Sequence, residues 1–143
     1  MGFFEKLFGS KKLKTTDADF GAIESFSKRG TDIGWQVNQE FLGFPIEILI
    51  AGDANGIVSH QKQILLDALQ QETSIKTEAE NALKEQFDNA EMEFISLEKH
   101  FHTRGMSVND TGFELTFQEK ATPNYFFNVH FENNKQVGVV IDG

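Results

Sequence analysis

Residues 33–51 constrain the fold most, because they contain two strand-like patterns separated by turn residues. The apolar residues of 35–41 are spaced two or four apart, so they share one face of a strand. In 46–50 every second residue is isoleucine, which gives the same pattern. Residues 42–45 contain a glycine, which accepts unusual backbone angles, and Pro45, which fixes one. These features predict a hairpin whose second strand, apolar at nearly every position, lies inside a sheet.

The elements on either side of the hairpin follow from the spacing of apolar residues. Residues 16–29 show a short helical pattern, with apolar residues at every third position. Apolar stripes predict one helix from about Val58 to Gln71 and a second from about 75 to 88. Residues 89–103 fit either a continued helix or an extended segment. From Arg104 onward the apolar period changes to two, which predicts about four strands joined by short turns.

Together these elements predict an α+β fold, with an antiparallel sheet of about six strands and two main helices packed on one face. Short turns between successive strands favour antiparallel neighbours. A chain of 143 residues suits one domain, which we place at 15–143. The predicted core consists of Trp35, Val37, Ile46, Ile48, Ile50, Ile64, Leu65, Leu69, Leu83, Phe87, Phe127, Val129, Val139 and Ile141.

Residues 1–14 differ from the rest of the chain in charge and composition. Four lysines against Glu5 give this segment a net charge of +3. Because the whole chain has a net charge of −9, the remaining residues carry −12. Its four large apolar residues are spaced for one face of a short helix, and Gly9 and Ser10 end that pattern. We predict a separable segment that packs on its own domain or on a dimer mate. The alternative is a helix that docks on a membrane surface or on a partner.

The acidic body of the chain excludes some partners and favours others. Phosphates would be repelled, so we expect no nucleic-acid binding, whereas a basic protein is a suitable partner. The chain has no cysteine, which fits a reducing compartment, and we expect a cytoplasmic protein. No apolar run approaches the roughly 18 residues of a membrane span, so we expect no stable membrane insertion.

Motifs for catalysis or metal binding are weak. On a strand, His100 and His102 would share a face with Glu98 and could hold a metal, whereas on a helix their rings would point in nearly opposite directions. The run that begins at Asp53 resembles a calcium loop but lacks the required Gly and Glu at its sixth and twelfth positions. Nucleophile-elbow and phosphate-loop patterns are missing. We therefore expect no cofactor and no enzymatic activity.

The second predicted helix carries an acidic surface. If its apolar stripe points inward, Glu78, Glu80, Glu85 and Asp88 point outward or to the flanks, and only Lys84 offsets them. These four carboxylates are the candidate binding residues for a basic partner. The alternative interpretation is a solvated helix surface that keeps the protein soluble and binds nothing.

The order of elements resembles small bacterial domains of unassigned function, some of which are immunity partners of toxins. The resemblance rests on residues 35–50 (WQVNQEFLGFPIEILI), on Met106-Ser107-Val108 with its turn to Phe113, and on the ending at 137–143 (VGVVIDG). It implies a non-enzymatic protein-binding module, such as an immunity-like inhibitor of a basic partner. The alternatives are a metal- or carboxylate-dependent enzyme and a structural homo-oligomer with a Phe-rich interface.

Overall fold

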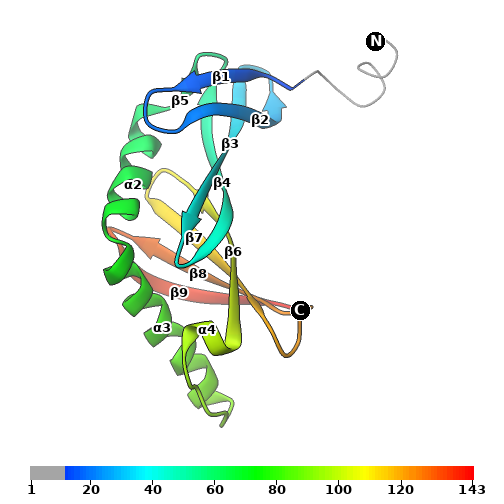
Figure 1. Cartoon of the computed structure of the whole chain (residues 1–143), viewed down its shortest axis with the longest axis vertical. Coiled ribbons are helices and arrows are strands. Elements are labelled where there is room, and N and C mark those ends of the chain that lie inside the picture. Colours follow the sequence, from blue (N-terminus) through cyan, green and yellow to red (C-terminus); the bar gives the residue numbers. More distant parts are fainter. Residues whose placement is uncertain (1–11) are drawn as a thin grey trace.

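The computed structural model describes residues 12–143, and this part of the chain contains nine strands and three helices (Figure 1). In chain order the elements are β1 (Lys14–Asp17), β2 (Gly21–Arg29), β3 (Asp32–Phe41), β4 (Phe44–Asp53), β5 (Gly56–Ile57), α2 (Ser59–Gln70), α3 (Glu72–Asn89), α4 (Leu97–His100), β6 (Phe101–Val108), β7 (Gly112–Glu119), β8 (Phe126–Glu132) and β9 (Lys135–Asp142).

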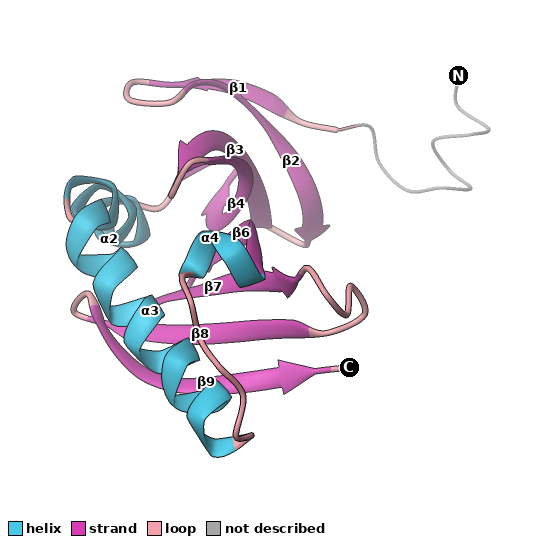
Figure 2. Ribbon diagram, turned by 60° about the horizontal axis from the view of Figure 1, so that its bottom comes forward, coloured by secondary structure: helices cyan, strands magenta, loops and turns pink. Residues whose placement is uncertain are grey.

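All nine strands belong to one mixed sheet. The strand order is β1-β2-β3-β4-β6-β7-β8-β9, and the short β5 pairs with β4. Every neighbouring pair is antiparallel except β4 and β6, which run parallel. Parallel neighbours need a long crossover connection, and α2 and α3 provide it. Figures 1 and 2 show these two helices following one side of the twisted sheet.

The prediction of about six antiparallel strands with two helices on one face is therefore wrong. The sheet has nine strands, it is mixed, and a third helix, α4, precedes β6. The error has two physical causes. The helical crossover brings the chain back to the sheet in the same direction as β4, and residues 16–29 form strands.

Residues 16–29 illustrate how pairing overrides a local pattern. Phe20, Ile23 and Phe26 recur at a helical spacing, but the segment forms the end of β1, a turn and β2. In β2 the buried residues are Ile23 and Ser25, two apart, and Phe26 is 46% exposed. The turn is held by Asp17, whose carboxylate accepts hydrogen bonds from two backbone N–H groups. Partner strands on both sides impose a period of two.

The predicted hairpin of residues 33–51 is confirmed as β3 and β4. The turn is two residues long, Leu42 and Gly43, and both have positive φ, of 52° and 84°. Such turns match the twist of antiparallel strands. Trp35 is fully buried, and its Nε1–H donates to Asp53 O at 3.0 Å.

The helices predicted near 58–71 and 75–88 are confirmed as α2 and α3, and residues 89–103 form a loop, α4 and the start of β6. α2 contacts β4, β6 and β7, while α3 contacts β8 and β9. Gln61 on α2 is buried and accepts the Ala51 N–H at 3.0 Å. Its amide group donates to Asp110 at 2.9 Å, so one side chain ties β4 to the β6–β7 turn.

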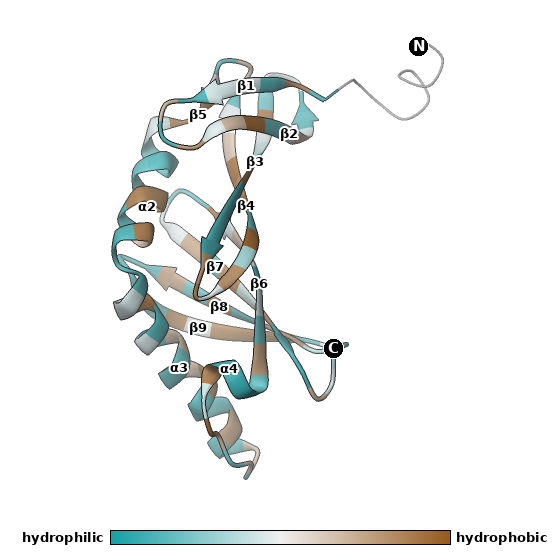
Figure 3. Cartoon of the chain, viewed as in Figure 1, coloured by the Kyte–Doolittle hydropathy of each residue, from teal (hydrophilic) through white to brown (hydrophobic). Residues whose placement is uncertain are grey.

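Most of the predicted core is buried. Ten of the fourteen residues have an exposed fraction of 8% or less, and Ile64, Leu69 and Val139 are half-buried. Ile141 is 44% exposed, so its prediction is wrong: it lies on the edge strand, where no neighbour covers it. Figure 3 shows the apolar residues concentrated along the strands and on parts of the helices.

The predicted N-terminal segment is only partly described. Residues 1–11 lie outside the described part of the chain. Leu13 exchanges hydrogen bonds with Ser25, and Lys14 begins β1, so the sheet starts within the segment assigned to 1–14. Among the described helices, none combines the length and the apolar composition needed to span a membrane.

Replacement of Ile48 by Ala should lower the free energy of unfolding by about 2–5 kcal/mol, because it leaves a cavity at a fully buried position. Denaturant unfolding followed by the fluorescence of Trp35, the only tryptophan, measures the loss. Leu49→Ala, on the opposite and less buried face of β4, is the control and should cost less than half as much. Equal losses would contradict the assigned faces.

Candidate functional site

The orientation of α3 determines what its acidic residues can do. Its buried residues include Ile75, Ala79, Ala82, Leu83 and Phe87, as the sequence predicts. Consecutive helical residues are about 100° apart, so two residues separated by two positions lie about 200° apart around the axis. Glu78 and Glu80 therefore lie on opposite sides of the helix, whereas Glu85, seven residues after Glu78, returns to within about 20° of its direction.

Glu78 lies on the flank of α3 that faces the last strand. Its Oε1 accepts a hydrogen bond from the Gln136 N–H of β9 at 3.1 Å, and the side chain is half-buried. This carboxylate satisfies a backbone donor on an edge strand. Glu78 thus holds α3 to β9.

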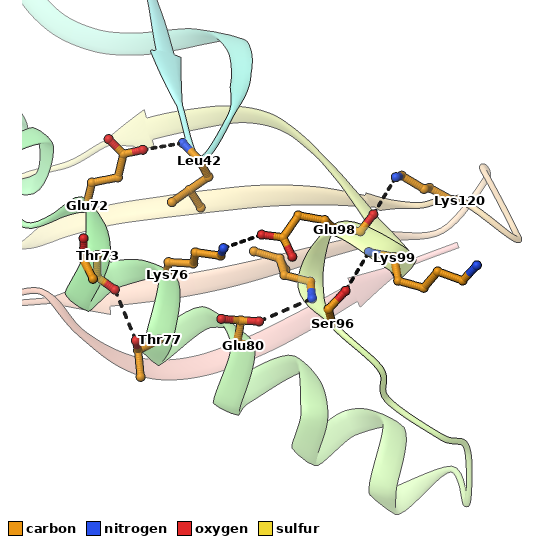
Figure 4. Close-up of polar contacts among 11 residues, drawn as sticks. Leu42, Glu72, Thr73, Lys76, Thr77, Glu80, Ser96, Glu98, Lys99 and Lys120 are labelled. Carbon is orange, nitrogen blue, oxygen red and sulfur yellow. Dashed lines mark hydrogen bonds and ion pairs between the residues drawn. The ribbon is translucent and has the colours of Figure 1, made fainter.

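Glu80 lies on the opposite flank, in a row of polar residues spaced four apart (Figure 4). Glu72 accepts the Leu42 N–H at 2.8 Å, and Glu80 accepts the Leu97 N–H at 3.4 Å. Between them, Lys76 forms an ion pair with Glu98. We call Glu72, Lys76 and Glu80 the polar flank. It joins α3 to the β3–β4 turn and to α4.

The Lys76–Glu98 pair shifts the titration of both groups. The hydrogen bond from Lys76 lowers the pKa of Glu98, helped by the backbone N–H of Glu98 itself. The same hydrogen bond raises the pKa of Lys76. The surrounding backbone is also tied down, because Lys120 Nζ donates to Glu98 O at 2.5 Å and Ser96 caps α4 by accepting the Lys99 N–H at 3.1 Å.

Glu85 and Asp88 are exposed and make no ion pair with any residue of 12–143. The chain that follows adds two further exposed carboxylates and two exposed apolar side chains, Met92 at 51% and Ile95 at 61%. We call this surface the α3 tip. It consists of Glu85, Asp88, Glu91, Met92, Glu93 and Ile95.

A cavity of about 600 Å³ opens beside the α3 tip. Its lining is mainly apolar, and charged groups of both signs surround it. The lining residues are Phe87, Met92, Glu93, Lys99, His100, Glu119, Lys120 and Ala121. The tip therefore combines carboxylates and exposed apolar side chains with an adjoining recess whose surface is mainly apolar.

The two candidate metal-ligating histidines make separate contacts. His100 ends α4, and its Nε2 accepts the Ile95 N–H at 2.9 Å while its ring lies 4.8 Å from that of Phe87. His102 is on β6, with its ring 4.4 Å from Phe44. Burial lowers the pKa of His102, and the charges of Arg104 and Lys120 lower it further. No group of three or more metal-binding side chains converges within residues 12–143.

Sequence reasoning identified Glu85 and Asp88 but not the other members of the α3 tip, and it missed the polar flank. The spacing of Glu72, Lys76 and Glu80 would have indicated a second stripe on α3, since side chains four apart are neighbours on a helix. Nothing in the sequence indicated that Met92 and Ile95 are exposed, because residues 89–103 fit two structures.

No family model matches this chain, and no curated protein or solved structure matches it closely enough to support a relationship.

Glu78→Ala and Glu80→Ala should each lower the free energy of unfolding by about 0.5–1.5 kcal/mol, because each removes the acceptor of a backbone N–H. Glu85→Ala and Asp88→Ala should change it by less than about 0.5 kcal/mol, since both side chains are exposed. Chemical denaturation of the four single variants measures the difference. Similar losses in all four would show that the flanks do not tie α3 to its neighbours.

The Lys76–Glu98 pair should make stability depend on pH in acid. The pKa of Glu98 is lowered on folding, so its contribution is complete above the ordinary value of 4.5 and is lost as the pH falls through the folded-state pKa. Both side chains are more than one-third exposed, so the contribution should not exceed about 1 kcal/mol.

The measurement compares the free energy of unfolding of the wild type and of Glu98→Gln from neutral to acidic pH. The difference should be largest near neutral pH and should shrink below about pH 4.5. Glu85→Gln, which removes an exposed carboxylate without a described ion pair, is the control and should follow the wild type. A constant difference for Glu98→Gln at all pH values would contradict the ion pair.

Proposed function

We propose that this protein is a non-catalytic binding module that recognises a basic protein through the α3 tip. The observation that carries the proposal is the exposure of Met92 and Ile95 among four carboxylates. Large apolar side chains that are exposed together at a surface often mark an interaction site. The adjoining cavity provides a recess for an apolar or aliphatic side chain of the partner.

The carboxylates of α3 differ in their contacts, and this difference supports the choice. The side chains of Glu78 and Glu80 accept hydrogen bonds inside the domain, from the backbone N–H groups of Gln136 and Leu97. Glu85 and Asp88 have no such role in the described chain. Of the four residues predicted from the sequence, these two are therefore the ones we assign to the partner, together with Glu91 and Glu93.

The finer role that we propose is inhibition of a basic, toxin-like partner, by analogy with the small bacterial domains that the order of elements resembles. An inhibitor of this kind needs fast association, and opposite charges on the two surfaces provide it. The lack of cysteine fits a partner met in a reducing compartment, and we propose the cytoplasm.

The test removes the charge of the α3 tip with Glu85→Gln, Asp88→Asn, Glu91→Gln and Glu93→Gln together. Affinity capture from the source cell identifies the partner, and the association rate is then measured with purified proteins at low and high salt. We expect the variant to associate at least about tenfold more slowly at low salt. The difference should vanish at about 1 M salt, where the screening length falls to about 3 Å.

The matched control removes the same number of carboxylates elsewhere, with Asp32→Asn, Glu40→Gln, Glu47→Gln and Glu132→Gln, all at exposed positions. It should associate with the partner nearly as fast as the wild type. A second variant, Met92→Ser with Ile95→Ser, should mainly accelerate dissociation, since it removes apolar contact area. A partner whose association and dissociation are the same for all variants would overturn the proposal.

A further inference from the structure

The sheet of the described chain ends at β1 on one side and at β9 on the other. β9 is eight residues long, twice the length of β1. One edge of β9 pairs with β8, and its other edge faces no strand of residues 12–143, as Figure 2 shows near the C-terminus. Such an edge presents N–H and C=O groups that can pair with another chain.

The central part of β9 is apolar and well exposed. Residues 136–141 contain no charged side chain, and Val137, Val140 and Ile141 are 58%, 51% and 44% exposed. Proteins usually protect an exposed edge strand with lysines, prolines or inward-pointing charges. These residues have none of those protections.

Two features cover the first half of β9 but leave the second half open. The Gln136 N–H already donates to Glu78, and a bulge at Val137 interrupts the pairing with β8. From Gly138 to Asp142 the pairing with β8 is regular. On the outer edge of that part, no described residue bonds the backbone.

Gly138 lies inside this regular part. A Cβ atom there would meet no described atom within 4 Å, and the residue does not have positive φ. Neither crowding nor backbone conformation in residues 12–143 therefore requires a glycine. A glycine inside a strand often marks the close approach of another backbone.

We propose that Gly138–Asp142 of β9 pairs antiparallel with the same segment of a second copy of this chain. The Gln136 N–H points away from β8, toward Glu78, and the bulge adds one residue at Val137. Beyond the bulge, the backbone N–H and C=O groups of successive residues point alternately toward β8 and toward the open edge. Val139 and Ile141 then direct their N–H and C=O groups outward. A two-fold axis at Val140 pairs Val139 of each copy with Ile141 of the other.

The charges at the ends of β9 do not oppose this pairing. With the axis at Val140, Asp142 of each copy lies opposite Gly138 of the other, and Lys135 lies outside the paired segment. Each copy has a net charge of −9, so a self-contact is favourable only where the acidic surfaces stay apart. The uncharged centre of β9 meets that condition, and the two sheets join into one.

The first experiment measures the mass of the full chain in solution by light scattering and analytical ultracentrifugation over a range of concentrations. We expect the mass to rise from 16.1 kDa toward twice that value. Val140→Lys places two like charges opposite each other at the axis and should weaken the association at least about tenfold. Val58→Lys, the same change at a similarly exposed valine on another surface, should leave it unaffected.

The second experiment uses the absence of cysteine from the chain. Val140→Cys introduces one thiol at the two-fold axis, where the Cα atoms of a directly opposite, non-hydrogen-bonded pair lie about 4.5 Å apart, within the range of disulfides. Under mild oxidation this variant should form a covalent dimer much faster than Val58→Cys does. Thermal unfolding of each variant confirms that it is folded.

The proposal is overturned if the wild type remains at 16.1 kDa at every concentration. It is also overturned if the Val140→Cys variant crosslinks no faster than the Val58→Cys variant, or if Val140→Lys associates as well as the wild type. Neither experiment involves the α3 tip, so the two proposals can fail separately.

Discussion

The parallel pairing of β4 with β6 is the contact on which the rest of the structure depends. It joins the antiparallel strands β1–β5 to the antiparallel strands β6–β9 through only three residue pairs, from Glu47–Gly105 to Leu49–Ser107. Ile48 and Met106 lie at its centre, and both are buried. Because so few backbone bonds connect the two groups of strands, side chains from the helices must reinforce the connection.

The helices provide this reinforcement through polar contacts as well as apolar packing. Gln61 joins β4 to the β6–β7 turn, and Glu72 holds the β3–β4 turn at Leu42, a residue with positive φ. A branched side chain in that conformation is strained, so the carboxylate stabilises a turn that its own sequence does not favour. The crossover is therefore a structural support for the sheet, and the first part of α3 contributes to it through Glu72 and Glu80.

The parts of the fold that the sequence predicts are those with a long, repeated pattern. The hairpin around Trp35 and the stripe of α3 through Leu83 each involve several turns or strand positions, and both are confirmed. The wrong predictions concern residues whose burial depends on the strands beside them. Ile23 takes its burial from the strands beside β2, and Ile141 loses its burial because β9 has no second neighbour.

The candidate site shows the same limit. The sequence locates the carboxylates on one helix, but it does not reveal that Glu78 meets Gln136, which lies far along the chain. A side chain that bonds a distant backbone group looks like one that is available to a partner until the fold is known. Of the four predicted residues, Glu85 and Asp88 are the two that are exposed and make no ion pair within residues 12–143, and their binding role stays a prediction.

The crossover also has a consequence for the speed of folding. Each pair of neighbouring strands is connected by a short turn, except β4 and β6. Their pairing closes a loop that contains the whole chain between Leu49 and Gly105. The entropy cost of ordering a loop rises with its length, and contacts between distant residues slow folding. The time needed to reach the native state should therefore be governed by the formation of α2 and α3. Changes that raise the helical propensity of that segment should accelerate folding more than changes in any hairpin.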